Sequence, residues 1–216
     1  MLKRIRRELA ADPSRRRKLE VLRELRRWNR RTPEADACES SLHAFVRHAW
    51  PIVEPRMAFL DNWHIRAICE HLEYATRTPH YKLLINVPPG CMKSLLVAVF
   101  WPCWVWGPAG WPESRWLFAS YSADLSTRDS LRCREILESD WYRRNWGHRV
   151  RLAGDANLKT YFANTAGGWR MATSVGGRGT GEHPDFRVWD DPHKVTEAES
   201  DVERENVLRW RDGTLA

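Results

Sequence analysis

The expected fold follows from residues 83–94, which read Leu83-Leu84-Ile85-Asn86-Val87-Pro88-Pro89-Gly90-Cys91-Met92-Lys93-Ser94. The apolar and β-prone residues at the start of this stretch are typical of a buried strand, and Pro-Pro-Gly then ends the strand sharply. The long apolar segment 95–106 that follows Lys93-Ser94 favours a helix. A strand, a tight loop, Lys-Ser and a helix in this order are the context of a phosphate-binding loop.

Such a loop has a defined chemistry. Pro89, Gly90, Cys91 and Met92 would surround the phosphates of ATP, where the N–H groups and the dipole of the helix start favour negative charge. Lys93 would reach the β- and γ-phosphates, and the hydroxyl of Ser94 would reach Mg²⁺. The full consensus G-x-x-x-x-G-K-[ST] has glycines where this chain has Val87 and Met92, so from this segment alone a strand-turn-helix corner with a chance Lys-Ser is the alternative.

A second segment, Phe186-Arg187-Val188-Trp189-Asp190-Asp191-Pro192, supports the phosphate-loop interpretation. A short apolar strand that ends in two acids is where a phosphate-loop enzyme places its metal and its water chemistry. Asp190 would hold Mg²⁺, and Asp191 would orient the attacking water or accept its proton. Pro192 cannot continue a central strand, so the strand ends where a site at its carboxyl edge requires. A solvated loop with two acids is the alternative for this segment alone.

The composition, charge distribution and cysteines of the chain indicate which class of protein it belongs to. The chain has 216 residues, 43% hydrophobic and 29% charged, as expected for a globular protein. Residues 1–31 hold 13 of the 35 Lys and Arg residues but four of the 28 Asp and Glu residues, so the net charge of +7 comes from the N-terminus. Five cysteines without a C-x-x-C pair fit reduced thiols, and no apolar run is long enough for a membrane span. We therefore expect a soluble protein of the cytoplasm.

The remaining elements predict an α/β protein with a mainly parallel sheet flanked by helices. A basic helical extension is expected over residues 1–36, with two short helices broken at 12–14 and a linker at 32–39, and the main domain over residues 37–216. The basic extension could hold DNA phosphates or a partner, or simply be a solvated helix. Helices are expected at 41–50, 63–76, 95–106, 124–141 and 197–211, and strands at 83–87, 115–120, 159–163, 168–173 and 186–189.

Two further residues are candidates for nucleotide contacts. His64 and its neighbour Trp63 begin a helix, where His64 could hydrogen-bond the adenine and Trp63 could stack on it, although an ordinary helix start with a packed Trp is the alternative. Arg178 lies in the glycine-rich segment 174–182 that precedes the acidic strand. This arginine could contact a phosphate or the nucleotide of a neighbouring subunit, or belong to a surface loop.

With both motifs placed, residues 55–212 resemble the ATPase domain of phage terminase large subunits. In that family Pro-Pro before a degenerate Lys-Ser loop recurs, as in Asn86 to Ser94 of this chain. The resemblance extends to five further blocks, which are Asn62-Trp63-His64, Ala119-Ser120-Tyr121-Ser122, Asn164-Thr165-Ala166-Gly167-Gly168, Thr180-Gly181-Glu182 and Asp190-Asp191-Pro192-His193.

The resemblance implies a P-loop NTPase of the additional-strand class, a Mg²⁺-dependent ATPase that drives double-stranded viral DNA into the procapsid. Its expected partners are double-stranded DNA, the portal protein of the procapsid, the terminase small subunit and further copies of this chain. Members usually continue into a coupling motif and a nuclease domain, which this chain does not show, so nuclease activity is not expected. Some members carry an arginine inside the phosphate loop, where Gly90 and Cys91 offer none. The alternatives are another nucleic-acid motor such as a helicase, or a fragment that binds nucleotide or DNA without turnover.

Overall fold

The computed structural model describes residues 20, 22, 32–179, 181–194 and 196–215. Apart from Glu20 and Leu22, the two helices expected within residues 1–31 therefore lie outside the described residues. The helices are α3 (Pro33–Ser40), α4 (Leu42–Val53), α5 (Trp63–Arg77), η1 (Leu95–Phe100), α6 (Trp101–Trp106), α7 (Ala123–Glu138), α8 (Asp140–Trp146) and α9 (Asp201–Leu215). The strands are β1 (Trp116–Ser120), β2 (Leu152–Asn157), β3 (Tyr161–Asn164), β4 (Trp169–Ser174) and β5 (Phe186–Trp189).

The five strands form one mixed sheet in the order β2-β3-β4-β1-β5. β1 lies parallel to both β4 and β5, whereas β2 with β3 and β3 with β4 pair antiparallel. The prediction of a mainly parallel sheet is therefore wrong. The physical reason is the length of the connections, because the turns after β2 and β3 are too short for a crossover and can only return the chain antiparallel. The chain is a mixed α/β protein.

The strand expected at Leu83–Val87 is also absent from this sheet. The segment has an extended, alternating pattern, since Leu83, Ile85 and Val87 pack partly buried against the core while Leu84 is 82% exposed. It forms no ladder with β5 or with any other described strand. A short apolar run specifies an extended chain over a core, but hydrogen-bonded pairing depends on a partner strand that the run itself does not encode. The linker expected at residues 32–39 is wrong as well, because α3 spans most of it.

Helix α3 forms because Thr32 caps its first turn, where the Oγ1 atom accepts the Ala35 N–H at 3.2 Å. Ala35 and Cys38 are buried, so the helix has an apolar side that belongs to the core. The indole N–H of Trp104 donates to the Cys38 carbonyl at 2.8 Å, which ties α3 to α6. Tertiary packing therefore makes this mostly polar segment a helix of the domain.

The helix expected at residues 95–106 is present but irregular. Its first part, η1, is π-helical, with the Trp101 N–H donating to the Leu96 carbonyl five residues back. Pro102 has no N–H to offer the carbonyl of Ala98, four residues earlier. That carbonyl accepts a bond from the Arg170 guanidinium on β4 at 3.1 Å. The irregular turn thus connects the helix after the loop to the sheet.

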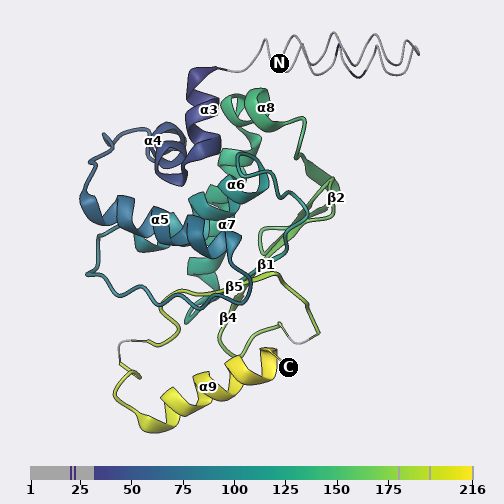
Figure 1. Cartoon of the computed structure of the whole chain (residues 1–216). Helices are drawn as coiled ribbons and strands as arrows, with labels where there is room; N and C mark the ends of the chain where they lie inside the picture. Colours follow the sequence, from purple (N-terminus) through teal and green to yellow (C-terminus); the bar gives the residue numbers. More distant parts are fainter. Residues whose placement is uncertain (1–19, 21, 23–31, 180, 195, 216) are drawn as a thin grey trace.

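Aromatic packing fixes this helix on the parallel part of the sheet. Trp116 on β1 stacks on Phe186 of β5 with ring centroids 4.0 Å apart, and Trp101 meets both rings edge-on. Helix α7 packs against β1, β4 and η1. Figure 1 shows α4, α5, α6 and α7 gathered in one group beside the sheet, with α9 lying apart from them. Among the described residues, no helix is long and apolar enough to cross a membrane.

The turn between β3 and β4 docks tightly on the loop that precedes β1. The buried Asn164 side chain donates to the Pro112 carbonyl at 2.7 Å and accepts the N–H groups of Ala166 and Gly168. A Cβ atom added at Gly168 would lie 2.1 Å from the Pro112 oxygen and 2.8 Å from the Ser114 oxygen. Only glycine fits this position, because the clashing atoms belong to the backbone.

Gly168→Ala should therefore destabilise the protein by about 2–3 kcal/mol, the usual result of overpacking a rigid site. Gly154→Ala on β2 is the matched control, since its added Cβ would meet nothing within 4 Å. We expect the control to change the free energy of unfolding by less than about 0.5 kcal/mol. Urea unfolding of both variants measures this, and equal stabilities of the two would contradict the close approach at Gly168.

Asp185 and Arg115 hold the starts of β5 and β1 together. The Asp185 carboxylate accepts the backbone N–H of Arg115 at 2.8 Å and two bonds from its guanidinium, each at 3.1 Å. Partial burial opposes ionisation of Asp185, but the bonds from Arg115 outweigh it and lower the pKa of the carboxyl. An aspartate with a lowered folded pKa stabilises the fold above its unfolded pKa and loses that effect as the pH falls through its folded pKa.

Asp185→Asn should lower the free energy of unfolding by about 1 kcal/mol at neutral pH. The loss is small because the side chains of both Asp185 and Arg115 are partly exposed. The difference from the wild type should shrink as the pH falls below about 4, near the unfolded pKa of aspartate. Urea midpoints measured over a pH series test this. Asp212→Asn, on the exposed side of α9, is the control and should show neither effect. A difference that is constant with pH would argue against the ion pair.

Candidate functional site

The parallel pairing of β1 and β5 brings the carboxyl ends of these two strands to the same edge of the sheet. The register pairs Ala119 with Trp189, so Ser120 and Asp190 both lie just past the paired region. The Asp190 N–H donates to the Ala119 carbonyl at 2.9 Å, and the Tyr121 N–H donates to the Asp191 carbonyl at 3.2 Å. These backbone bonds fix the position of the acidic pair relative to β1.

Lys93 lies against this acidic pair. Its Nζ atom is 3.3 Å from Asp190 Oδ1 and forms a short hydrogen bond to Asp191 Oδ1. The contact joins segments 98 residues apart in the sequence. The side chain of Asp190 is 17% exposed and that of Asp191 is 66% exposed, so Asp190 is the inner acid and Asp191 the outer one. The structure therefore brings together three of the residues that the sequence singles out.

Charge keeps Lys93 protonated in this place. Partial burial lowers the pKa of the ammonium group, but the bond to Asp191 and the nearby charge of Asp190 outweigh it and raise the pKa above the usual value for lysine. A cation held between two carboxylates can exchange one of them for the anionic oxygens of a phosphate. An anionic group bound by Lys93 would therefore lie beside the two acids.

The loop before Lys93 has two residues with left-handed backbone. Gly90 has a φ of 84°, which glycine adopts freely, and Met92 has a φ of 60°. Met92 occupies the position at which the phosphate-loop consensus has glycine, and its backbone takes the conformation that glycine adopts most readily. The Cys91 N–H bonds back to the Pro88 carbonyl at 3.4 Å, which closes the turn. Pro89 and Gly90 are exposed, so the loop is open to a ligand.

A cavity of about 40 Å³ opens beside the acidic pair. Its lining includes Ser94 from the loop, Ser120 at the end of β1, and both Asp190 and Asp191. Two carboxylates and a hydroxyl are hard oxygen ligands that suit Mg²⁺, which commonly keeps waters and substrate phosphates as its other ligands. Among the described residues, no group of three or more His, Cys, Asp or Glu side chains could hold a metal ion.

Two candidates from the sequence lie elsewhere. The ring of His64 meets that of Trp63 at 6.1 Å between centroids, and Trp63 is 78% exposed, which leaves an aromatic face open to solvent. No interaction of the described residues joins His64 to the loop, so its contact with adenine stays a prediction. The Arg178 side chain is 83% exposed and lies 3.7 Å from Glu182.

Sequence reasoning missed two buried charged residues in the same cavity. Arg170 on β4 is fully buried, Asp129 on α7 is 3% exposed, and both line the cavity beside the acidic pair. The available signal was a single arginine among the apolar residues of an expected strand, which is uncommon in a core. Position in the strand alone could not show that this arginine reaches the site.

Cys91 provides a probe of the loop. It is half-buried, whereas the other four cysteines are buried, and burial raises the pKa of the Cys38 and Cys69 thiols to about 12. A thiol reagent should therefore label one cysteine in the folded chain and all five after denaturation.

Mg²⁺ and ATP together should slow the labelling of Cys91, because a bound phosphate covers the loop. Cys91→Ser is the control and should remove the fast-reacting thiol. Peptide mapping of the labelled protein by mass spectrometry checks both results. Fast labelling at another cysteine, or labelling of Cys91 that nucleotide does not change, would contradict this assignment of the loop.

Comparisons of the chain with protein-family models, with curated proteins and with solved structures found no match.

Proposed function

We propose that the chain is the Mg²⁺-dependent ATPase motor domain of a phage terminase large subunit, with a P-loop NTPase fold of the additional-strand class. The observation that carries the proposal is the contact of Lys93 with both Asp190 and Asp191 at the carboxyl edge of two parallel strands. In a phosphate-loop enzyme the lysine of the loop and the acids after a neighbouring strand meet around the γ-phosphate. The mixed sheet adds an antiparallel part, β2 to β4, on the side away from the acids.

Each residue has a role in hydrolysis of the γ-phosphate. Lys93 would exchange its bond to Asp191 for the β- and γ-phosphates and stabilise the charge that develops on them. Release of Asp191 would free this outer, exposed carboxylate to orient the attacking water and accept its proton. Asp190 and the Ser94 hydroxyl would hold Mg²⁺, which neutralises charge on the phosphates.

Nucleotide specificity would come from the start of α5. The exposed indole of Trp63 is available to stack on a base, and the neighbouring His64 would hydrogen-bond it. The transition state also needs a cation beyond Lys93. The exposed Arg178, or an arginine of a neighbouring copy, would supply it, and turnover by a single chain is therefore expected to be slow, because an arginine finger contributes about 10³–10⁵ in rate.

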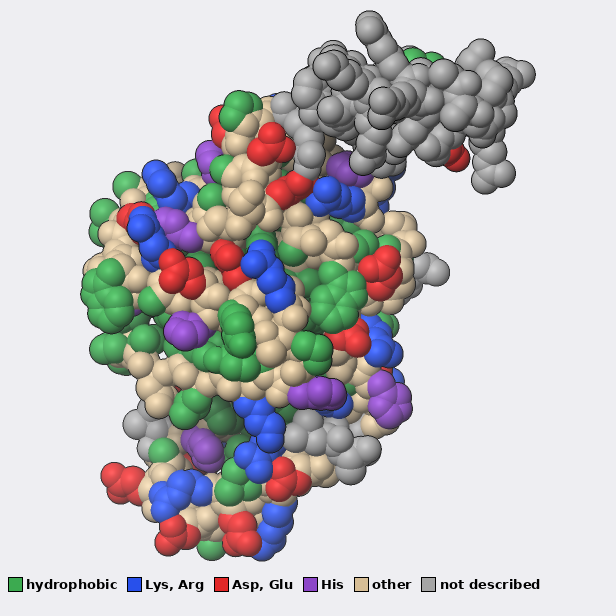
Figure 2. All heavy atoms as spheres, in the orientation of Figure 1, with side chains coloured by type: hydrophobic (Ala, Val, Ile, Leu, Met, Phe, Trp, Pro, Cys, Tyr) green, Lys and Arg blue, Asp and Glu red, His purple; other side chains and the backbone are tan. Residues whose placement is uncertain are grey.

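The proposed partner is double-stranded DNA, with the portal protein, the small subunit and further copies of the chain in the assembled motor. A packaging motor must move any sequence, so its contacts are mainly to phosphates. On the face shown in Figure 2, basic and acidic side chains are interspersed rather than separated. The largest basic excess of the sequence is in residues 1–31, which favours that segment as a contact for DNA phosphates.

The test is release of phosphate from ATP by the purified chain with Mg²⁺, with and without double-stranded DNA. Lys93→Ala and Asp190→Ala should each lower turnover by about 10²–10³, the effect of losing one group that stabilises transition-state charge. Asp191→Asn should lower it by about 10²–10⁴, because the amide cannot accept a proton. Lys159→Ala, at an exposed turn, is the control and should turn over at the wild-type rate.

The binding of a fluorescent ATP analogue separates the alternatives. Turnover that the three substitutions remove, and that DNA stimulates, supports the motor. Nucleotide binding without turnover would favour a nucleotide- or DNA-binding fragment instead. Neither binding nor turnover would show that the interpretation of the loop is wrong. Strand separation driven by ATP would favour a helicase.

A further inference from the structure

Arg170 is a buried cation whose hydrogen bonding is incomplete. Its side chain is fully buried on β4, and its Nη2 atom donates to the Ala98 carbonyl at 3.1 Å. The guanidinium carbon lies 4.2 Å from the centre of the Phe118 ring, so one face of the group is covered by an aromatic side chain. The Nε and Nη1 atoms have no hydrogen-bond partner among the described residues. Two buried donors are therefore free to bind something else.

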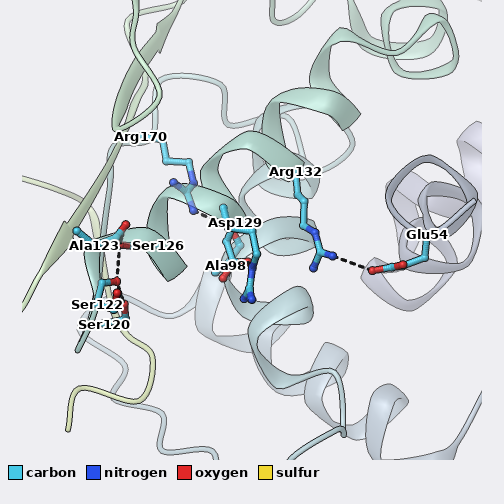
Figure 3. A network of polar contacts seen from close by, with 10 residues as sticks. Glu54, Ala98, Ser120, Ser122, Ala123, Ser126, Asp129, Arg132 and Arg170 are labelled. Carbon is cyan, nitrogen blue, oxygen red and sulfur yellow. Dashed lines mark hydrogen bonds and ion pairs between the residues drawn. The ribbon is translucent and has the colours of Figure 1, made fainter. Parts of the chain in front are cut away.

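The cavity supplies the space for what these donors bind. Arg170 lines the same cavity of about 40 Å³ as Ser94, Asp190 and Asp191. A volume of this size holds roughly two or three water molecules. The close-up in Figure 3 shows the guanidinium of Arg170 directed toward Ala98 and Asp129, on the side of the sheet that α7 covers. One space thus connects the buried guanidinium to the acidic pair.

Asp129 is a competing partner for Arg170. This residue is 3% exposed and accepts a bond from Arg128 Nε at 3.0 Å, and no ion pair within 4.0 Å joins it to Arg170 among the described residues. Burial lowers the pKa of Arg170, and the nearby Asp129 and two buried cysteines only partly oppose this. A buried charge without a close counter-charge destabilises a fold. Such a group is expected where function requires it.

We propose that Arg170 is a positioning residue of the acidic site, and that its Nε and Nη1 groups hold the Asp190 carboxylate through water molecules in the cavity. The inference rests on the proposed function, in which Asp190 is a ligand of Mg²⁺. Asp190 is the inner acid of the pair, whereas Asp191 is exposed and bonded to Lys93. A carboxylate that accepts such bonds on one oxygen keeps its other oxygen directed toward the metal position.

The experiment compares Arg170→Met and Arg170→Lys with the wild type. Methionine fills similar space without a buried charge, so its melting temperature should equal or exceed that of the wild type. The Mg²⁺ concentration for half-maximal turnover should nevertheless rise by about 10–100-fold, the usual effect of losing a group that orients a metal ligand. Lysine keeps the charge but loses the planar fork, so it should also raise the Mg²⁺ requirement.

A second measurement on the same variants follows Mg²⁺ binding without turnover. The shift in melting temperature is titrated with Mg²⁺ in the presence of a non-hydrolysable ATP analogue. Arg132→Met is the matched control, because this arginine also lies on the α7 side but pairs with Glu54 at 2.9 Å and does not line the cavity. The control should leave the Mg²⁺ requirement unchanged.

Two results would overturn the proposed role of Arg170 while leaving the proposed function standing. A folded Arg170→Met with the wild-type Mg²⁺ requirement would show that the cavity does not couple Arg170 to Asp190. A large fall in melting temperature for Arg170→Met and Arg170→Lys, with an unchanged Mg²⁺ requirement, would make Arg170 a structural partner of Asp129. A wild type that shows neither turnover nor a Mg²⁺-dependent shift would instead overturn the proposed function itself.

Discussion

The parallel alignment of β1 between β4 and β5 is the constraint on which the site depends. Parallel strands end at the same edge of a sheet, so Ser120, Ser174 and Asp190 leave the sheet together. The stacking of Trp116 on Phe186, with Trp101 packed against both, then fixes the helix after the loop above these strands. Lys93 reaches the acids because this helix is held in that position. Loss of register between β1 and β5 would therefore separate the lysine from its partners.

Much of the secondary structure could be predicted from local sequence signals. Helices α4 and α5 follow Ser41 and Asn62, each of which caps its helix, and β3 and β4 flank a turn whose Gly167 has a φ of 96°. β1 and β5 are short apolar segments with turn residues on either side. The meeting of Lys93 with Asp190 and Asp191 was inferred from the order of two motifs, and it depends on the parallel pairing that a crossover connection allows.

The wrong predictions about the sheet and the oversight of Arg170 have a common physical origin. Whether an extended segment joins a sheet, and in which direction, is decided by contacts between residues distant in the sequence. Leu83–Val87 has the alternation of a strand but packs against the core without a ladder. β2, which reads Leu-Ala-Gly-Asp-Ala-Asn, has no strand-like alternation but pairs with β3 through an irregular register. Arg170 was overlooked for the same reason. Its importance comes from Ala98, Phe118 and the cavity, which belong to other elements.

Four departures from regular local structure lie around this one edge of the sheet. Met92 and Asp191 have left-handed backbones, η1 is π-helical, and Arg170 has two buried donors without partners. Each of these features raises the free energy of the folded chain, and each concerns a residue of the loop, the acidic pair or the cavity between them. A core selected for stability alone would relax them independently, with a glycine at position 92 or an apolar side chain at position 170. Their shared position around one cavity supports the proposal that the lysine and the two acids bind a ligand there.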